Sequence, residues 1–157
     1  IASNDISVVT QPGFLYYSGE RYLSKVDSHY QKWLYPINSL MSLGIKLAYG
    51  SDNPVIPINP LVGIHSAVNR VSSSGDKLTP NERISPLDAL RMYTLGSAYV
   101  SYQENIKGSI EKGKIADIIL LDQDPTDVRS EDIINIKVLM TIASGNVVWG
   151  DPTYLRM

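Results

Sequence analysis

The chain has 157 residues, and its 14 Lys and Arg against 16 Asp and Glu give a formal net charge of −2 at pH 7. This near-balance lacks the basic surplus that binding to nucleic acid or to an anionic membrane requires, so neither partner is expected. A hydrophobic share of 43% and a charged share of 19% are typical of a folded globular chain. Because there is no cysteine, disulfides and thiolate metal sites are excluded, and the cytoplasm is the expected compartment.

The first third of the chain predicts a strand–helix–strand unit. Ile6–Thr10 is a β-branched run that ends at a Gln-Pro-Gly turn, and Ile45–Tyr49 is a second apolar run that ends at Gly50. Between them, Pro36 and Gly44 mark the first turn and the end of a predicted helix. A connection of this length makes the two strands parallel neighbours.

Helix patterns lie on either side of the second strand. Before it, aromatic and aliphatic residues recur at helical spacing and predict a packing surface, formed by Tyr22, Val26, Tyr30 and Trp33. After it, Asn59 caps a predicted helix that begins at Pro60. Ser85 caps another that begins at Pro86 and continues to about Gly96, with a short continuation through Tyr102.

The sequence changes in character after Lys107. Short apolar runs alternate with turn residues and predict four short strands, at Ser109–Ile110, Ile118–Leu121, Lys137–Ala143 and Val147–Trp149. A sheet this small has to bury one face against another layer, so partner strands are expected from elsewhere. We place a domain boundary near residue 107, between a first segment of residues 1–107 and a second of residues 108–157.

Asp52 is the strongest candidate for chemistry, in the motif GSDNPV of residues 50–55. An acidic residue just past the carboxyl end of a buried parallel strand stands where α/β barrel enzymes place catalytic groups. A carboxylate there binds a metal ion and accepts a proton from the water on that ion. Gly-Ser-Asp is equally a turn signal, so a purely structural turn is the alternative interpretation.

Four motifs follow one another in the chain: GIKLAYGSDNPV (44–55), NPLVGIHSAVNR (59–70), ISPLDALRMYT (84–94) and KGSIEKGKIADIILLDQDP (107–125). In this order they resemble the C-terminal part of metal-dependent amidohydrolases, in the branch that contains the N-substituted formamide deformylases. The resemblance covers about Val8 to Trp149. It implies an α/β fold, the C-terminal portion of a (β/α)8 TIM-type barrel with Ile6–Thr10 and Ile45–Tyr49 as strands seven and eight, followed by strands of a small β-sandwich.

The resemblance also implies a reaction, the hydrolysis of an amide or related C–N bond in a small-molecule substrate by metal-activated water. Asp52 matches the aspartate that binds the divalent metal, usually zinc, and shuttles the proton in such enzymes. The family's histidine ligands have no counterpart, because His29 and His65 are the only histidines and neither sits in a ligand motif. A catalytic zinc ordinarily takes three protein ligands. We therefore expect an incomplete fragment that binds no metal and is inactive by itself.

Gln11 and Arg21 are candidate substrate-binding residues. Gln11 follows the first strand and faces the same rim, with plain backbone capping as the alternative. Arg21 is expected in a loop beside the barrel mouth and resembles an arginine of the branch, with a surface ion pair as the alternative. Other polar residues have structural interpretations: His65 as a packed or solvated side chain, Arg70 as a complement to its helix dipole, and Asp117 as the residue that begins a strand.

A non-catalytic folding or interaction module is the alternative function. A cut barrel exposes strand edges and an apolar face, so self-association of the fragment, or a homo-oligomer, is expected. A flavodoxin-like binding domain fits less well, because no Gly-rich phosphate loop follows either strand.

Overall fold

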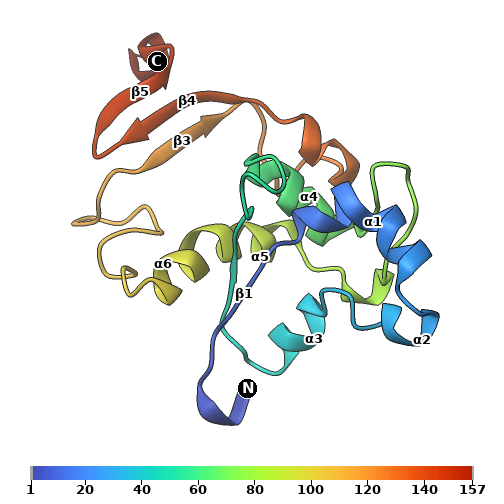
Figure 1. Cartoon of the computed structure of the whole chain (residues 1–157). Coiled ribbons are helices and arrows are strands. Elements are labelled where there is room, and N and C mark those ends of the chain that lie inside the picture. The colour runs from blue at the N-terminus through green and yellow to red at the C-terminus, as the bar shows by residue number, and fades with distance from the viewer. Residues whose placement is uncertain (1, 157) are drawn as a thin grey trace.

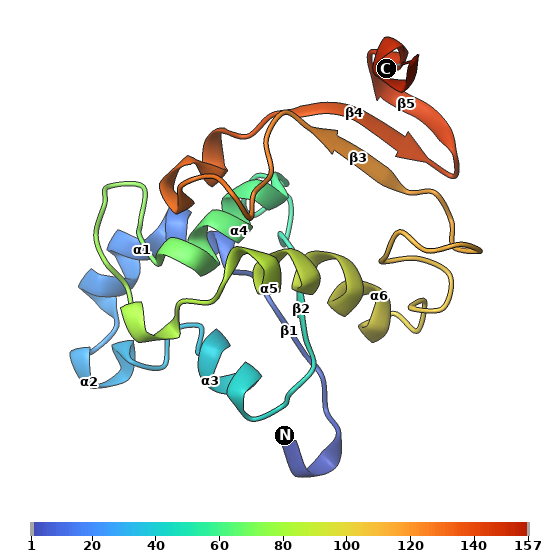
Figure 2. The same ribbon diagram turned by 180° about the vertical axis from the view of Figure 1, so that it is seen from behind.

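Two parallel strands lie at the centre of the fold. The structure, a computed structural model that describes residues 2–156, pairs β1 (Val8–Thr10) with β2 (Leu47–Tyr49), with Val8 opposite Leu47 and Thr10 opposite Tyr49. The two strands run side by side behind the long helical segment in Figure 2. The predicted parallel pair is therefore confirmed, and each strand begins two residues later than expected.

Three helices connect the two strands: α1 (Gly13–Lys25), α2 (Ser28–Gln31) and α3 (Ile37–Ser42). Helix α3 begins after Pro36 and ends before Gly44, which has a φ of 74°. This conformation favours glycine, and the predicted end of the helix is confirmed.

The Tyr-rich segment is not one continuous helix. The backbone is extended at Val26, and the Asp27 carboxylate then accepts the N–H of His29 at 2.8 Å to begin α2. Because the helix is broken here, the last two residues of the predicted packing surface, Tyr30 and Trp33, are exposed. The prediction of a shared packing surface is wrong for these two residues.

Helix α4 (Pro60–Asn69) is the most buried helix. The Asn59 side chain accepts the N–H of Leu61 at 3.0 Å, which confirms the predicted cap. All residues from 61 to 68 are buried, because α1 packs against the helix and so does the 3-10 helix η4 (Ser130–Asn135). One core cluster unites strand β2, α4 and the segment of η4, and includes Leu47, Tyr49, Leu61, Ile64, Ile133 and Ile136.

The predicted helix after Ser85 and its short continuation are also confirmed, as α5 (Pro86–Arg91), the π-helical turn η3 (Met92–Gly96) and α6 (Ser97–Val100). Its cap is the Ser85 hydroxyl, which accepts the N–H of Asp88 at 3.1 Å. The turn η3 lies along the edge of β2 that β1 leaves free. There the Ser97 hydroxyl donates to the Tyr49 carbonyl at 3.2 Å. A side chain at Gly96 would collide with the Leu47 carbonyl, so this approach requires glycine.

The C-terminal part forms an antiparallel sheet in the order β3 (Ile118–Leu121), β4 (Val138–Ala143), β5 (Asn146–Gly150). Three of the four predicted strands are thus confirmed. Asp117 begins this sheet as predicted, since its carboxylate accepts the N–H of Ser144 at 2.8 Å. In Figures 1 and 2 the sheet extends beyond the helices, with the C-terminus at its far end.

The fourth predicted strand, at Ser109–Ile110, does not form. Gly108 has a φ of 95°, and the Ser109 hydroxyl is held between Lys114 and Glu111 at 2.6 and 2.7 Å. These contacts fold the segment into a turn and leave Ile110 exposed.

The expected α/β class is confirmed at the level of a mixed fold with two small sheets. Short 3-10 helices at Ala2–Asn4, Pro80–Glu82 and Pro152–Arg156 complete the elements. No helix within the described range is long and apolar enough to span a bilayer.

Candidate active site

The carboxyl ends of β1 and β2 lie at the same edge, because the strands are parallel and in register. The N–H of Gly50 donates to the Thr10 carbonyl at 3.0 Å and extends the pairing past the last strand residues. Gln11 follows β1 at this edge, and Asp52 follows β2. The fold therefore brings to one rim two candidate residues that are far apart in the sequence.

Asp52 begins a tight turn and has an exposed side chain. Its φ is 60°, its carbonyl accepts the N–H of Val55 at 2.9 Å, and the Asn53–Pro54 peptide bond is cis. Aspartate is one of the few residue types that adopt this left-handed backbone readily. Among the residues that the structure describes, none forms an ion pair or a hydrogen bond with the carboxylate. The turn and the chemical interpretation are thus compatible, since the backbone makes the turn and the carboxylate stays available.

Tyr22 and Tyr35 are half-buried and are joined through their hydroxyl groups. Burial raises the pKa of Tyr35 most, its hydrogen bond with the Tyr22 hydroxyl (3.1 Å) raises it further, and the negative charge of Asp52 adds to this effect. The charge of Arg70 acts in the opposite direction. Tyr35 therefore stays a neutral phenol at neutral pH.

Gln11 and Arg21 differ in their relation to the rim. The Gln11 carbonyl accepts the N–H of Phe14 at 3.2 Å at the start of α1, and its half-buried side chain has no hydrogen-bond partner in the part of the chain described. Arg21 lies in the third turn of α1, which corrects its expected position in a loop. Eight residues beyond Gly13, it is roughly 12 Å along the helix axis. It is exposed, and no described acidic residue pairs with it.

The position of Arg21 has a physical reason. The preceding Gly19 suggests a loop, but here it lies inside α1 where the helix passes closely over Ser72 and Leu78. A side chain at Gly19 would overlap the side chains of both residues. The glycine therefore allows close packing of the helix and does not end it.

The described residues do not fit a catalytic metal ion. No three His, Asp or Glu side chains among them are close enough together to bind one. His29 is exposed on α2, and His65 is buried in α4, where its Nδ1 pairs with the side-chain amide of Asn69 at 3.1 Å. The packed interpretation of His65 is therefore confirmed. Asp52 alone is one ligand where zinc ordinarily takes three from the protein.

Arg70 has a role that its sequence position did not reveal. It is 0% exposed, has a φ of 57° at the end of α4, and spreads its guanidinium between two remote segments. It donates to the carbonyls of Leu34 (2.7 Å), Tyr35 (3.1 Å) and Leu78 (3.2 Å), and to the Thr79 hydroxyl. Arg70 is thus a buried cross-link and not a surface complement to the helix dipole.

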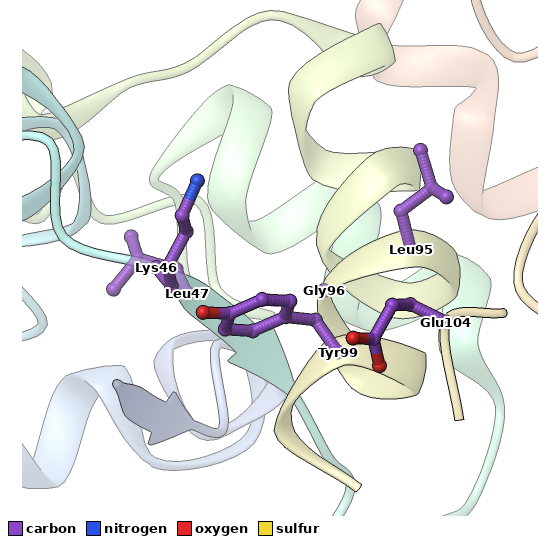
Figure 3. Close-up of a pocket in the computed structure, with 6 residues that line it drawn as sticks. All are labelled: Lys46, Leu47, Leu95, Gly96, Tyr99 and Glu104. Carbon is purple, nitrogen blue, oxygen red and sulfur yellow. The ribbon is translucent and has the colours of Figure 1, made fainter. Parts of the chain in front are cut away.

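A cavity of about 230 Å³ lies elsewhere, at the free edge of β2. Figure 3 shows its lining residues, which are Lys46, Leu47, Leu95, Gly96, Tyr99 and Glu104. The Lys46 ammonium lies 5.7 Å from the centre of the Tyr99 ring, and one carboxylate oxygen of Glu104 is buried without a described hydrogen-bond partner. Because Lys46 precedes β2, this cavity is at the opposite end of the strand from Asp52 and does not belong to the rim.

Comparisons with protein families, with known sequences and with solved structures all give hydrolases of related kinds. The profile of a family described as the amidohydrolase family matches residues 2–149. The N-substituted formamide deformylase of Arthrobacter pascens is 32% identical over 146 residues, which cover 92% of this chain and 27% of that protein. An uncharacterized metal-dependent hydrolase from Pyrococcus horikoshii has 31% identity and a TM-score of 0.71 over 82% of this chain and 26% of that chain. An uncharacterized metal-dependent hydrolase from Pyrococcus furiosus has 34% identity and a TM-score of 0.67 over 81% of this chain and 25% of that chain. The chain thus spans about a quarter of the length of these relatives.

Proposed function

Because this chain belongs to the amidohydrolase family, we propose that it forms part of a metal-dependent hydrolase that cleaves an amide or related C–N bond. The observation that carries the proposal is the position of Asp52, whose exposed carboxylate follows a buried parallel strand on the rim that also holds Gln11. Barrel enzymes place catalytic groups at this edge. The name of the Arthrobacter relative makes N-substituted formamides the first substrate class to test.

Each candidate residue has a proposed role in the whole protein. Asp52 is one metal ligand and the proton shuttle, Gln11 is a hydrogen-bonding partner for the substrate, and Arg21 contributes to substrate binding from α1. The metal is a divalent ion, with zinc as the first candidate. Since the described residues contain no set of three ligands, the remaining ligands are proposed to come from sequence outside these 157 residues.

The same proposal covers the architecture. It assigns β1 and β2 to the seventh and eighth strands of a (β/α)8 barrel and the sheet β3–β5 to a small β-sandwich, with the boundary near residue 107. The parallel register and the helical connection between β1 and β2 support the barrel assignment. Within the second part, η4 returns to pack on α4 of the first.

The test is the substitution Asp52→Asn in the full-length protein. We expect turnover of an N-substituted formamide to fall by about a thousandfold or more, because the amide cannot accept a proton. The circular dichroism spectrum and the urea midpoint should stay unchanged, since the side chain is exposed. Asp127→Asn, at another exposed aspartate, is the matched control and should keep full activity. Activity retained by the Asp52 variant would contradict the assignment.

A non-catalytic module that self-associates is the second candidate function. One face of the C-terminal sheet favours it, because Ile119 and Trp149 both lie opposite Thr141 and therefore share a face. Their side chains are 51% and 58% exposed. Apolar side chains gathered in this way mark surfaces that are covered in an assembly.

A further inference from the structure

We propose that the cavity at the free edge of β2 binds a small zwitterion, a molecule of amino-acid size that carries one ammonium group and one carboxylate. The residues that line this cavity include one cationic side chain, Lys46, and one anionic side chain, Glu104. Because the cavity lies at the opposite end of β2 from Asp52, the inference goes beyond the proposed function and does not depend on it.

The size and the apolar lining of the cavity limit the class of ligand. Its volume of about 230 Å³ is smaller than the roughly 300–1,000 Å³ of sites for drug-sized molecules, so the ligand has to be small. Leu47, Leu95 and the ring of Tyr99 provide apolar surface that a short hydrocarbon segment can cover. Since Gly96 has no side chain, η3 lies directly on β2, and the apolar part of the lining is held in place.

Glu104 provides an acceptor that lacks a donor. One of its carboxylate oxygens is buried, and no residue in the part of the chain described donates a hydrogen bond to it. The turn that carries Glu104 is fixed, because the N–H of Gln103 donates to the Ala98 carbonyl at 2.8 Å and the N–H of Lys107 donates to the Gln103 carbonyl at 3.0 Å. A buried acceptor without a donor is costly, and a ligand ammonium group would supply a charge-assisted hydrogen bond.

Lys46 provides a cation without an anionic partner. Its ammonium lies 5.7 Å from the centre of the Tyr99 ring, and no acidic side chain of the described residues forms an ion pair with it. Its backbone is fixed at the start of β2, where the N–H of Val8 donates to the Lys46 carbonyl at 2.9 Å. In Figure 3, Lys46 and Glu104 lie toward opposite ends of the Tyr99 ring. A ligand carboxylate is therefore the partner that Lys46 favours.

The two opposite charges exclude ligands with a single charge. A simple amine has a partner in Glu104 but is repelled by Lys46, and a simple carboxylate has a partner in Lys46 but is repelled by Glu104. Only a molecule with both charges finds a partner for each. The cavity therefore favours a zwitterion over an amine or an acid of the same size.

Calorimetric titration of the full-length protein tests the inference. The probes are glycine, β-alanine and γ-aminobutyrate, which differ in the separation of their charges, and we expect at least one to bind with a millimolar or lower Kd. Butylamine and butyrate each carry one of the two charges and should bind at least about tenfold more weakly than the best zwitterion, because each loses a charge-assisted hydrogen bond. Absent binding of all three zwitterions, or equal binding of a probe with one charge, would overturn the inference.

Substitution of the two charged residues assigns the binding to this cavity. Lys46→Met and Glu104→Gln should each weaken binding of the best zwitterion at least about tenfold, and Lys46→Met should strengthen binding of butylamine because the repulsion is removed. Lys32→Met is the matched control: Lys32 lies 5.3 Å from the centre of the Trp33 ring but does not line the cavity, so binding should stay unchanged. Unchanged binding of the zwitterion in either cavity variant would overturn the inference.

These measurements are independent of the proposed function. They record binding alone, so a protein that hydrolyses no formamide still decides the inference. Circular dichroism checks that the variants are folded, and the comparison of probes on the unmodified protein needs no variant.

Discussion

At the scale of single residues, Arg70 determines how three segments meet. Its planar guanidinium carries five donors, and they satisfy carbonyls that precede α3 and that follow the loop after α4. Burial lowers the pKa of Arg70 to about 10, while the charge of Glu82 acts in the opposite direction. The side chain therefore stays protonated at neutral pH and provides a buried charge that is held by hydrogen bonds.

Arg70→Met should lower the free energy of unfolding by about 3 kcal/mol, because it leaves several buried carbonyls without a donor. Arg70→Lys should recover only part of this loss, since one ammonium group cannot span the same acceptors. Urea denaturation measures both effects. Arg91→Met is the control: this side chain is 58% exposed and pairs with Asp88 at 3.8 Å, so its loss should stay below about 1 kcal/mol. An equally small effect at Arg70 would contradict the cross-link.

His65 should make stability depend on pH. Burial lowers the pKa of His65 below its ordinary 6.5, against the opposing effects of a hydrogen bond to Ser130 and the charge of Glu131. As the pH falls below about 6.5, the unfolded chain takes up a proton that the folded chain does not. The free energy of unfolding should therefore be highest above this pH and fall as the pH drops toward the pKa of the folded state.

Urea denaturation between pH 7.5 and pH 5 measures this dependence. His65→Gln should flatten it, whereas His29→Gln, at an exposed histidine, should leave it unchanged. An unaltered slope in the His65 variant would contradict the assignment.

The residues that could be located from the sequence are those with local partners. Asn59 and Ser85 cap helices through N–H groups two and three residues away, so their roles are visible in a short stretch of sequence. Arg70 has partners in segments that lie 35 positions earlier in the chain, and no local pattern marks them. Asp52 is a candidate from the sequence because it follows a recognisable strand, but its left-handed backbone appears only in the structure.

At the scale of elements, the edge of β2 depends on the turn η3. The contact needs a residue without a side chain at Gly96, where the helix lies directly on the Leu47 carbonyl. A π-helical turn inserts one residue relative to an α-helix and so changes which residues face the strand. The sequence predicted the helix from its cap but did not predict this turn, because its cause is the packing against β2.

Gly96→Ala should therefore destabilise the fold by about 2 kcal/mol, because the new methyl group meets backbone that cannot move aside independently. Elsewhere in a helix the same change is stabilising. Gly50→Ala is the control, since nothing lies within 4 Å of a side chain built there. Thermal or urea unfolding measures the stability of the two variants. Equal stabilities would contradict the close contact at Gly96.

Element predictions failed where side chains competed with the backbone pattern. The packing surface predicted for the Tyr-rich segment is interrupted because Asp27 caps a new helix. The strand expected at Ser109–Ile110 is replaced by a turn because the Ser109 hydroxyl bonds to Glu111 and Lys114. The spacing of hydrophobic residues gives no information about these side-chain hydrogen bonds, so neither change could be predicted from it.

At the scale of the whole molecule, the C-terminal sheet should drive self-association of the 157-residue chain. Its projecting face carries exposed apolar side chains, and burying them against a second copy removes them from water. Light scattering should give a mass larger than that of one chain at micromolar concentration. Trp149→Glu should lower this mass, whereas Leu43→Glu, outside the sheet, should not. A monomer in every case would contradict the prediction.

The place of η4 in the sequence determines when the core of the protein can form during synthesis. Ile133 and Ile136 belong to the same core cluster as Leu61 and Ile64, although they are synthesised about seventy residues later. Until they emerge from the ribosome, α4 keeps part of its apolar surface in water. This core therefore stays incomplete while about seventy residues are synthesised, and during that interval its exposed apolar surface is a binding site for chaperones.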